Sequence, residues 1–159
     1  MQAALWAQAL QDSSFAAAIR GGAYVYPFVN ILHVLGIGLI VGSILALDFR
    51  ILGFARSVSA EGASQLLTPF AVAGLAIAIP SGFALYASDA VSLSQNNLMW
   101  TKLVLIAVGI GNAVLFRKLW NSRFADWERN ATALARSQAI LSILIWISVP
   151  VLGRLVAYL

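Results

Sequence analysis

The stretch GGAYVYPFVNILHVLGIGLIVGSILAL, residues 21–47, decides the fold class because it contains no Asp, Glu, Lys or Arg. A helix that crosses a bilayer needs about 20 predominantly apolar residues, and this stretch is longer than that. We expect the helix to begin near Tyr24. Over the whole chain, 61% of the residues are hydrophobic and 10% are charged, whereas soluble domains carry about 25% charged residues. The sequence therefore predicts an integral membrane protein.

Three further stretches are expected to span the membrane. The first span should cover residues 24–50 approximately, and the others approximately 66–88, 98–120 and 137–158. Thr68 and Pro69 predict the start of the second span, since a hydroxyl N-cap followed by proline suits a helix N-terminus. The third and fourth spans reach full length only if Lys102, Arg117 and Arg154 extend their charged ends toward the interface. The chain, residues 1–159, is thus predicted to be one all-α membrane domain, a four-transmembrane-helix bundle.

The segment before the first span differs in pattern. In residues 1–20, apolar side chains alternate with polar ones such as Gln8, Gln11 and Asp12. This pattern is typical of a short amphipathic helix that lies on the membrane surface. Gly21 and Gly22 are expected to form the hinge between this helix and the first span.

The distribution of Lys and Arg predicts the orientation, because short cytoplasmic loops carry an excess of these residues. Three of the ten, Arg20, Lys102 and Arg154, lie near the N-terminus, the middle connection and the C-terminus. The other seven follow spans one and three: Arg50, Arg56, Arg117, Lys118, Arg123, Arg129 and Arg136. We therefore expect a multi-pass protein of the bacterial inner membrane with both termini in the periplasm.

Several kinds of chemistry are excluded by what the sequence lacks. There is no cysteine, so no thiol nucleophile or thiolate metal site can form. No catalytic triad, phosphate-binding loop or pair of carboxylates is recognisable. The net charge of +4 comes without a basic run interleaved with aromatic residues, so no nucleic acid is expected as a partner.

His33 is the only histidine and lies within the first span. An ionisable side chain inside a membrane is a functional candidate by default. Three interpretations stay open: a hydrogen bond to a neighbouring helix, coordination of a haem iron or another metal, or proton relay. Asn30 and Gly36 flank His33 at about 60° on either side of a helix with 100° per residue. Gly36 is expected to leave room for a flat ligand beside the imidazole.

The opposite face of the same span carries small residues. Gly38, Gly42 and Ala46 form a stripe about 140° to 220° away from His33. Small residues at this spacing allow the backbones of two helices to approach closely. We expect this face of the span to pack against another helix, and the stripe is the expected contact in a homo-oligomer or larger membrane complex.

Two cations share the predicted outer half of the membrane with His33. Lys102 begins the third span and Arg154 lies near the end of the fourth. Together with His33 they could seat an anionic group, such as haem propionates or a quinone head group. The alternative is that each is an ordinary interfacial anchor. At the inner end of the first span, Asp48 is expected to pair with Arg50, or with an arginine of another span.

The order of motifs resembles a family of uncharacterised bacterial four-span membrane proteins. The residues that carry the resemblance are Ile19-Arg20, Tyr26-Pro27, His33 to Gly36, Gly42, Asp48 to Gly53, Trp100 to Leu103, Asn112, Ala135 to Ser137, Trp146 and Gly153 to Tyr158. This resemblance covers nearly the whole chain and implies the four-span architecture without implying a reaction.

A fainter similarity concerns a histidine in the first span and Trp-x-Lys-Leu at the start of a later one. In these features the chain is similar to the haem-binding protoporphyrinogen oxidase of the small membrane type. That similarity implies haem b as a cofactor, with His33 and Lys102 at the functional positions. The second histidine-bearing segment of that family has no counterpart here.

Three functions therefore remain as hypotheses. The first is a redox or electron-transfer protein that binds haem b through His33, with Asn30, Gly36, Lys102 and Arg154 around the cofactor. The second is a non-catalytic subunit of a larger membrane complex. The third is a transporter of a small solute.

Overall fold

The computed structural model describes residues 5–124, 126–127, 131–156 and 158. Within this part of the chain the secondary structure is helical, which confirms the predicted all-α class. The elements are α1 (Leu5–Gln11), α2 (Ser14–Gly21), α3 (Val25–Leu52), α4 (Ala60–Ser88), α5 (Ala90–Gln95), α6 (Asn97–Trp120), the 3-10 helix η1 (Asn121–Arg123) and α8 (Ala133–Leu155). Among the described residues, four helices are long and apolar enough to cross a membrane: α3, α4, α6 extended by η1, and α8.

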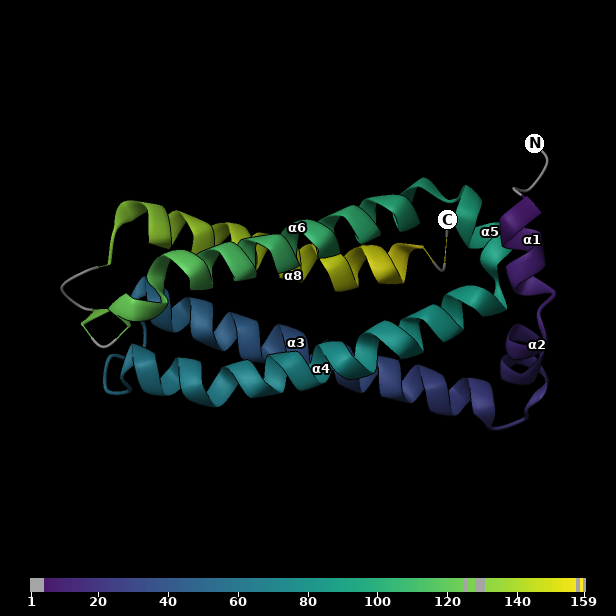
Figure 1. The fold of residues 1–159 in the computed structure, drawn as a ribbon, viewed down its shortest axis with the longest axis horizontal. Coiled ribbons are helices and arrows are strands. Elements are labelled where there is room, and N and C mark those ends of the chain that lie inside the picture. The colour runs from purple at the N-terminus through teal and green to yellow at the C-terminus, as the bar shows by residue number, and fades with distance from the viewer. Residues whose placement is uncertain (1–4, 125, 128–130, 157, 159) are drawn as a thin grey trace.

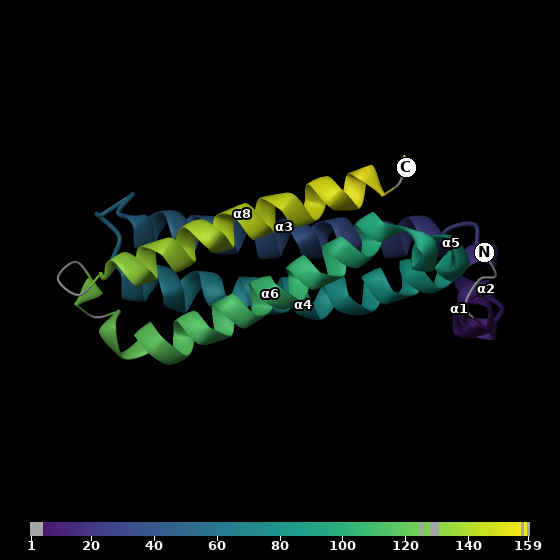
Figure 2. The ribbon, with the colours of Figure 1, turned by 90° about the horizontal axis from the view of Figure 1, so that it is seen from above.

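These four helices run alternately up and down along one axis (Figure 1). Helices α1, α2 and α5 lie at the same end of the bundle as the last turn of α8, and we call this the termini end. The opposite end carries the α3–α4 and α6–α8 connections, and we call it the loop end. Helix α3 packs chiefly against α4 and also against α8, which in turn packs against α6. Figure 2 shows the same arrangement from above, with α8 lying along α3.

The N-terminal segment is two short helices rather than the single one predicted. Ser13 breaks the segment because its backbone is extended and its hydroxyl accepts a hydrogen bond from the N–H of Ala16, which caps α2. Arg20 Nη1 then donates to the carbonyl of Ser88 on α4 at 3.1 Å. The ring of Phe15 stacks on Phe83 of α4 with centroids 6.1 Å apart. Both contacts hold the segment across the termini end of the bundle.

Helix α4 begins earlier than predicted. Ser59, not Thr68, is the N-cap, and its hydroxyl accepts from the N–H of Gly62 at 3.0 Å. The start at Thr68 and Pro69 was therefore wrong, and Pro69 lies inside the helix. The Thr68 hydroxyl instead accepts a hydrogen bond from Arg117 of α6, so it serves a tertiary contact.

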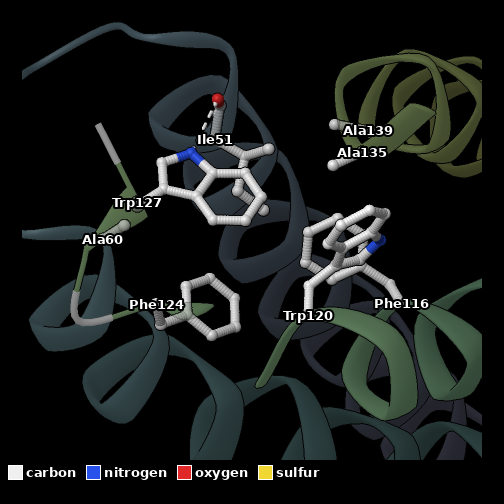
Figure 3. Close-up of a cluster of buried hydrophobic side chains, with 8 residues drawn as sticks. All are labelled: Ile51, Ala60, Phe116, Trp120, Phe124, Trp127, Ala135 and Ala139. Atoms are coloured by element: carbon white, nitrogen blue, oxygen red, sulfur yellow. Dashed lines mark hydrogen bonds between the residues drawn. The ribbon is translucent and has the colours of Figure 1, made fainter. Parts of the chain in front are cut away.

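A cluster of four buried aromatic residues lies at the loop end (Figure 3). Phe116, Trp120, Phe124 and Trp127 are each at most 8% exposed. Trp127 stacks on Phe124 with centroids 5.4 Å apart, and its indole N–H donates to the carbonyl of Ile51 at 3.2 Å. The connection after α6 is thereby fastened to the end of α3.

We expect Trp127→Ala to lower the free energy of unfolding by about 3–5 kcal/mol, because it removes a large buried ring and leaves a cavity. The Ile51 carbonyl also loses its donor. Unfolding of the purified protein in detergent would measure the loss. Trp6→Ala is the matched control, since Trp6 is 51% exposed. Equal losses in the two variants would contradict this account of the loop-end core.

Asp48 does not pair with any arginine in the described part of the chain, so the predicted arginine pair is not formed there. Its carboxyl is buried close to Ser142 of α8, and its Oδ2 has no hydrogen-bond partner among the described residues. Arg50 Nε donates to the carbonyl of Val58 at 2.5 Å, and Arg117 donates to α4. Helix geometry explains why Asp48 and Arg50 do not pair. Arg50 follows Asp48 by two positions, and residues two apart on a helix face away from each other.

Candidate functional site

The imidazole of His33 is held by α4. Nδ1 lies 3.0 Å from the carbonyl oxygen of Ala78 and 3.2 Å from the Ser81 hydroxyl. A carbonyl only accepts, so Nδ1 carries the proton that binds Ala78. The Ser81 hydroxyl donates to the carbonyl of Ile77 at 2.6 Å, which leaves its lone pairs for the same N–H. In the neutral imidazole, Nε2 therefore bears the lone pair.

Nε2 has no hydrogen-bond partner among residues 5–124, 126–127, 131–156 and 158. A histidine that donates one ring N–H to a backbone carbonyl and leaves the other nitrogen free has the arrangement found in metal-bound histidines. The hydrogen bond fixes the tautomer and the ring orientation. The arrangement is also that of a histidine that accepts a proton at Nε2.

Space for the ring comes from Gly82. A Cβ at this position would lie 2.7 Å from Cε1 of His33, so any other residue there would force the ring to move. Gly36 has a different role from the one predicted. A Cβ at Gly36 would meet the backbone N of Ala78 at 2.9 Å and the oxygen of Gly74 at 3.0 Å. The glycine therefore permits close packing of α3 on α4 and leaves no room for a flat ligand.

Lys102 lies in the same region as His33. Its positive charge acts on the imidazole from across the bundle, without a direct contact between the two side chains among the described hydrogen bonds. The ammonium lies against α8 at Gly153, where an added Cβ would be 3.1 Å from Nζ. Lys102 is partly buried, so its charge is less screened than that of an exposed lysine.

Arg154 and Asn30 are not drawn into this group. Arg154 is exposed, its Nη2 lies 2.5 Å from the hydroxyl of Tyr158, and its guanidinium lies over the Tyr158 ring at 4.9 Å from the centroid. This is the geometry of an interfacial anchor. Asn30 is also exposed, and no hydrogen bond joins its side chain to the described part of the protein.

The small-residue stripe faces away from the rest of the chain. A Cβ added at Gly38 or Gly42 would meet no described atom within 4 Å, and Ala46 is exposed. The stripe therefore makes no close contact with the described part of its own chain, and its contact with another subunit stays a prediction. The α3–α4 contact uses Gly36 and Gly74 instead, since only these glycines lie where the two backbones touch.

The residues of α4 that hold His33 were not identified as site residues from the sequence. Ser81 and Gly82 follow Pro80, and this run of a proline and two small residues inside a span was a signal that something approaches α4 closely. Gly153, which lies beside Lys102, was not identified as a site residue either. The sequence alone does not show which helix lies opposite a given glycine.

The fold and this site define a multi-pass helical membrane protein with one oriented histidine and one partly buried lysine between its spans. The chain belongs to a family of unknown function, DUF6644, whose model matches residues 6–159. No curated protein and no solved structure matches the chain. The similarity to the haem-binding protoporphyrinogen oxidase family therefore finds no support in these comparisons.

Proposed function

We propose that this chain is a redox protein of the bacterial inner membrane that binds haem b, with Nε2 of His33 as an axial ligand. The observation that supports this is the hydrogen bond from Nδ1 to the Ala78 carbonyl, which fixes the lone pair on Nε2. A bound haem would supply one-electron transfer within the membrane.

The ligand set of the chain suits haem better than a bare metal ion. Among the described residues, no group of three or more His, Asp or Glu could hold a metal. A porphyrin brings four nitrogen ligands of its own and needs only axial ones from the protein. One imidazole per chain therefore fits a haem iron with one protein ligand, or with a second from another subunit.

The space around His33 restricts how haem could enter. Gly82 lies against the imidazole ring and Gly36 lies against the backbone of α4. Neither glycine therefore leaves space for a porphyrin beside the ring. Nε2, which points away from the Ala78 carbonyl that Nδ1 binds, would hold the iron. Lys102, whose charge acts on His33, is the cation we propose for a propionate, whereas Arg154 is hydrogen-bonded to Tyr158. The proposal accordingly rests on His33 and Lys102.

The orientation proposed here puts the loop end in the cytoplasm and the termini end in the periplasm. The support is the excess of Lys and Arg in the connections after α3 and α6. His33 and Lys102 would then lie in the periplasmic half of the membrane.

An absorbance spectrum of protein purified after growth with added haem precursor tests the redox proposal. We expect a Soret band at a stoichiometry near one haem per chain or per dimer. A colourless preparation that also fails to bind added haemin would reject the proposal.

A second candidate function is that of a structural subunit in a larger assembly. The open stripe of Gly38, Gly42 and Ala46 favours it, because small residues on a lipid-facing helix allow close helix contact. This function does not require the histidine to bind anything.

We expect Gly42→Leu to abolish assembly while leaving the single chain folded, since the added side chain meets no described atom of its own chain. Crosslinking in native membranes would measure assembly. Gly111→Leu is the control, because Gly111 is equally open but lies on α6. Unchanged crosslinking in Gly42→Leu would count against the stripe as an interface.

A further inference from the structure

A polar pocket lies at the loop end, away from His33. Its volume is about 390 Å³, and it opens between the first turns of α4 and the last turn of α6. The lining residues are Glu61, Ser64, Gln65, Thr68, Pro69, Arg117, Asn121 and Phe124. Since α4 packs on α3 and α6 packs on α8, the pocket separates the two helix pairs.

Arg117 is the cation of this pocket, and α4 orients it. Its Nη2 donates to the Ser64 hydroxyl at 3.2 Å and also to the Thr68 hydroxyl. Ser64 is only 5% exposed, so one of the two anchors is fixed in the protein interior. In the described part of the chain, Nε and Nη1 of Arg117 have no hydrogen-bond partner. These donors remain for a ligand.

Glu61 supplies the opposite charge in the same pocket. Its Oε1 accepts from Gln65 Nε2 at 3.4 Å, and no described residue forms an ion pair with it. The pocket therefore presents a guanidinium and a carboxylate that do not neutralise each other by direct contact. Its ligand should carry both an anionic and a cationic group.

The chemistry and the position together select the ligand class. A guanidinium group binds phosphate through charge-assisted N–H donors such as Nε and Nη1, and a carboxylate binds an ammonium group. Arg117 lies in the last turn of a membrane-spanning helix, where lipid head groups meet the protein. Pro69 and Phe124 add apolar surface to the lining. We propose that this pocket binds the head group of a zwitterionic aminophospholipid, with phosphate on Arg117 and ammonium on Glu61.

Native mass spectrometry of the full-length protein tests this proposal. The protein is released from vesicles that contain equal amounts of phosphatidylethanolamine, phosphatidylcholine and phosphatidylglycerol. We expect preferential retention of phosphatidylethanolamine. Arg117→Gln should reduce the retained lipid by about tenfold or more, because it removes the charged donor to phosphate. Lys118→Gln is the matched control, since Lys118 neighbours Arg117 but does not line the pocket.

A second variant keeps the test informative if Arg117→Gln weakens the contact between α4 and α6. Glu61→Gln leaves the arginine and its anchors in place, and it should remove the preference for phosphatidylethanolamine while lipid is still retained. Equal retention of the three lipids by the unaltered protein would overturn the proposal. So would an equal loss in Lys118→Gln, which would indicate a general basic surface.

The shared chemistry of a phosphate and an amine also exists in soluble molecules. Phosphoethanolamine, added at the concentration of the lipid, should not displace phosphatidylethanolamine if the acyl chains contribute to binding. Displacement at equal concentration would overturn the lipid as occupant and indicate a soluble zwitterion.

Discussion

Replacing His33 with alanine is expected to abolish haem binding. Removing an outer hydrogen-bond partner of a metal ligand lowers metal affinity by a factor of about 10–100. His33→Ala removes the ligand itself, so the loss of haem affinity should be larger. The measurement is the Soret absorbance per chain of the purified protein, before and after titration with haemin. His33 is partly buried, so the variant could also disturb the α3–α4 contact.

Two further variants separate ligation from folding. Asn30→Ala lies on the same helix at an exposed position without a described hydrogen bond, so it should keep the Soret band. Ser81→Ala removes one of the two partners of Nδ1 and leaves the Ala78 carbonyl, so it should weaken haem binding without abolishing it. A Soret band of full intensity in His33→Ala would refute the proposed ligand.

Gly74→Leu is expected to be the most damaging single substitution in the contact between α3 and α4. A Cβ at this position would lie 2.8 Å from the oxygen of Gly36 and 2.9 Å from the backbone N of Ile40. Backbone atoms cannot move aside as a flexible side chain can, so the two helices must separate. Overpacking costs about 1–3 kcal/mol in a typical core, and a backbone clash should reach the upper end of that range or exceed it.

The matched comparison is Gly42→Leu in the same unfolding assay. Gly42 lies on α3, and a Cβ there meets no described atom within 4 Å. Leucine also has a helix propensity better than that of glycine by about 0.8 kcal/mol. Gly42→Leu should therefore be neutral or slightly stabilising for the single chain. Similar losses in Gly74→Leu and Gly42→Leu would show that the close contact does not run through Gly74.

Gly74→Leu has a second expected consequence. Because Ala78 lies one turn beyond Gly74, separation of the helices would also draw the Ala78 carbonyl away from His33. Haem binding should therefore fall together with stability, whereas Gly42→Leu should leave it unchanged.

The sequence predicted the four spans because the bilayer imposes a length and a composition on any helix that crosses it. It also predicted that His33 and Lys102 lie in one region, since topology alone places both in the same half of the bundle. Gly53 directly follows α3 and has the left-handed backbone, φ 105°, that glycine adopts easily, so this helix end also has a local cause. These features depend on local sequence and on the membrane.

Only the tertiary structure decided which face of each helix meets which neighbour. Gly36 and Gly42 look alike in sequence, yet one touches the backbone of α4 and the other touches no described residue. Likewise, Thr68 resembles a helix cap but holds Arg117 of another span. Nearly all sides of these helices are apolar, so hydrophobic periodicity gives no direction in a membrane as it does in water. The orientation of the four predicted spans, and with it the hydrogen bond that fixes His33, arises from side-chain packing between segments far apart in the chain.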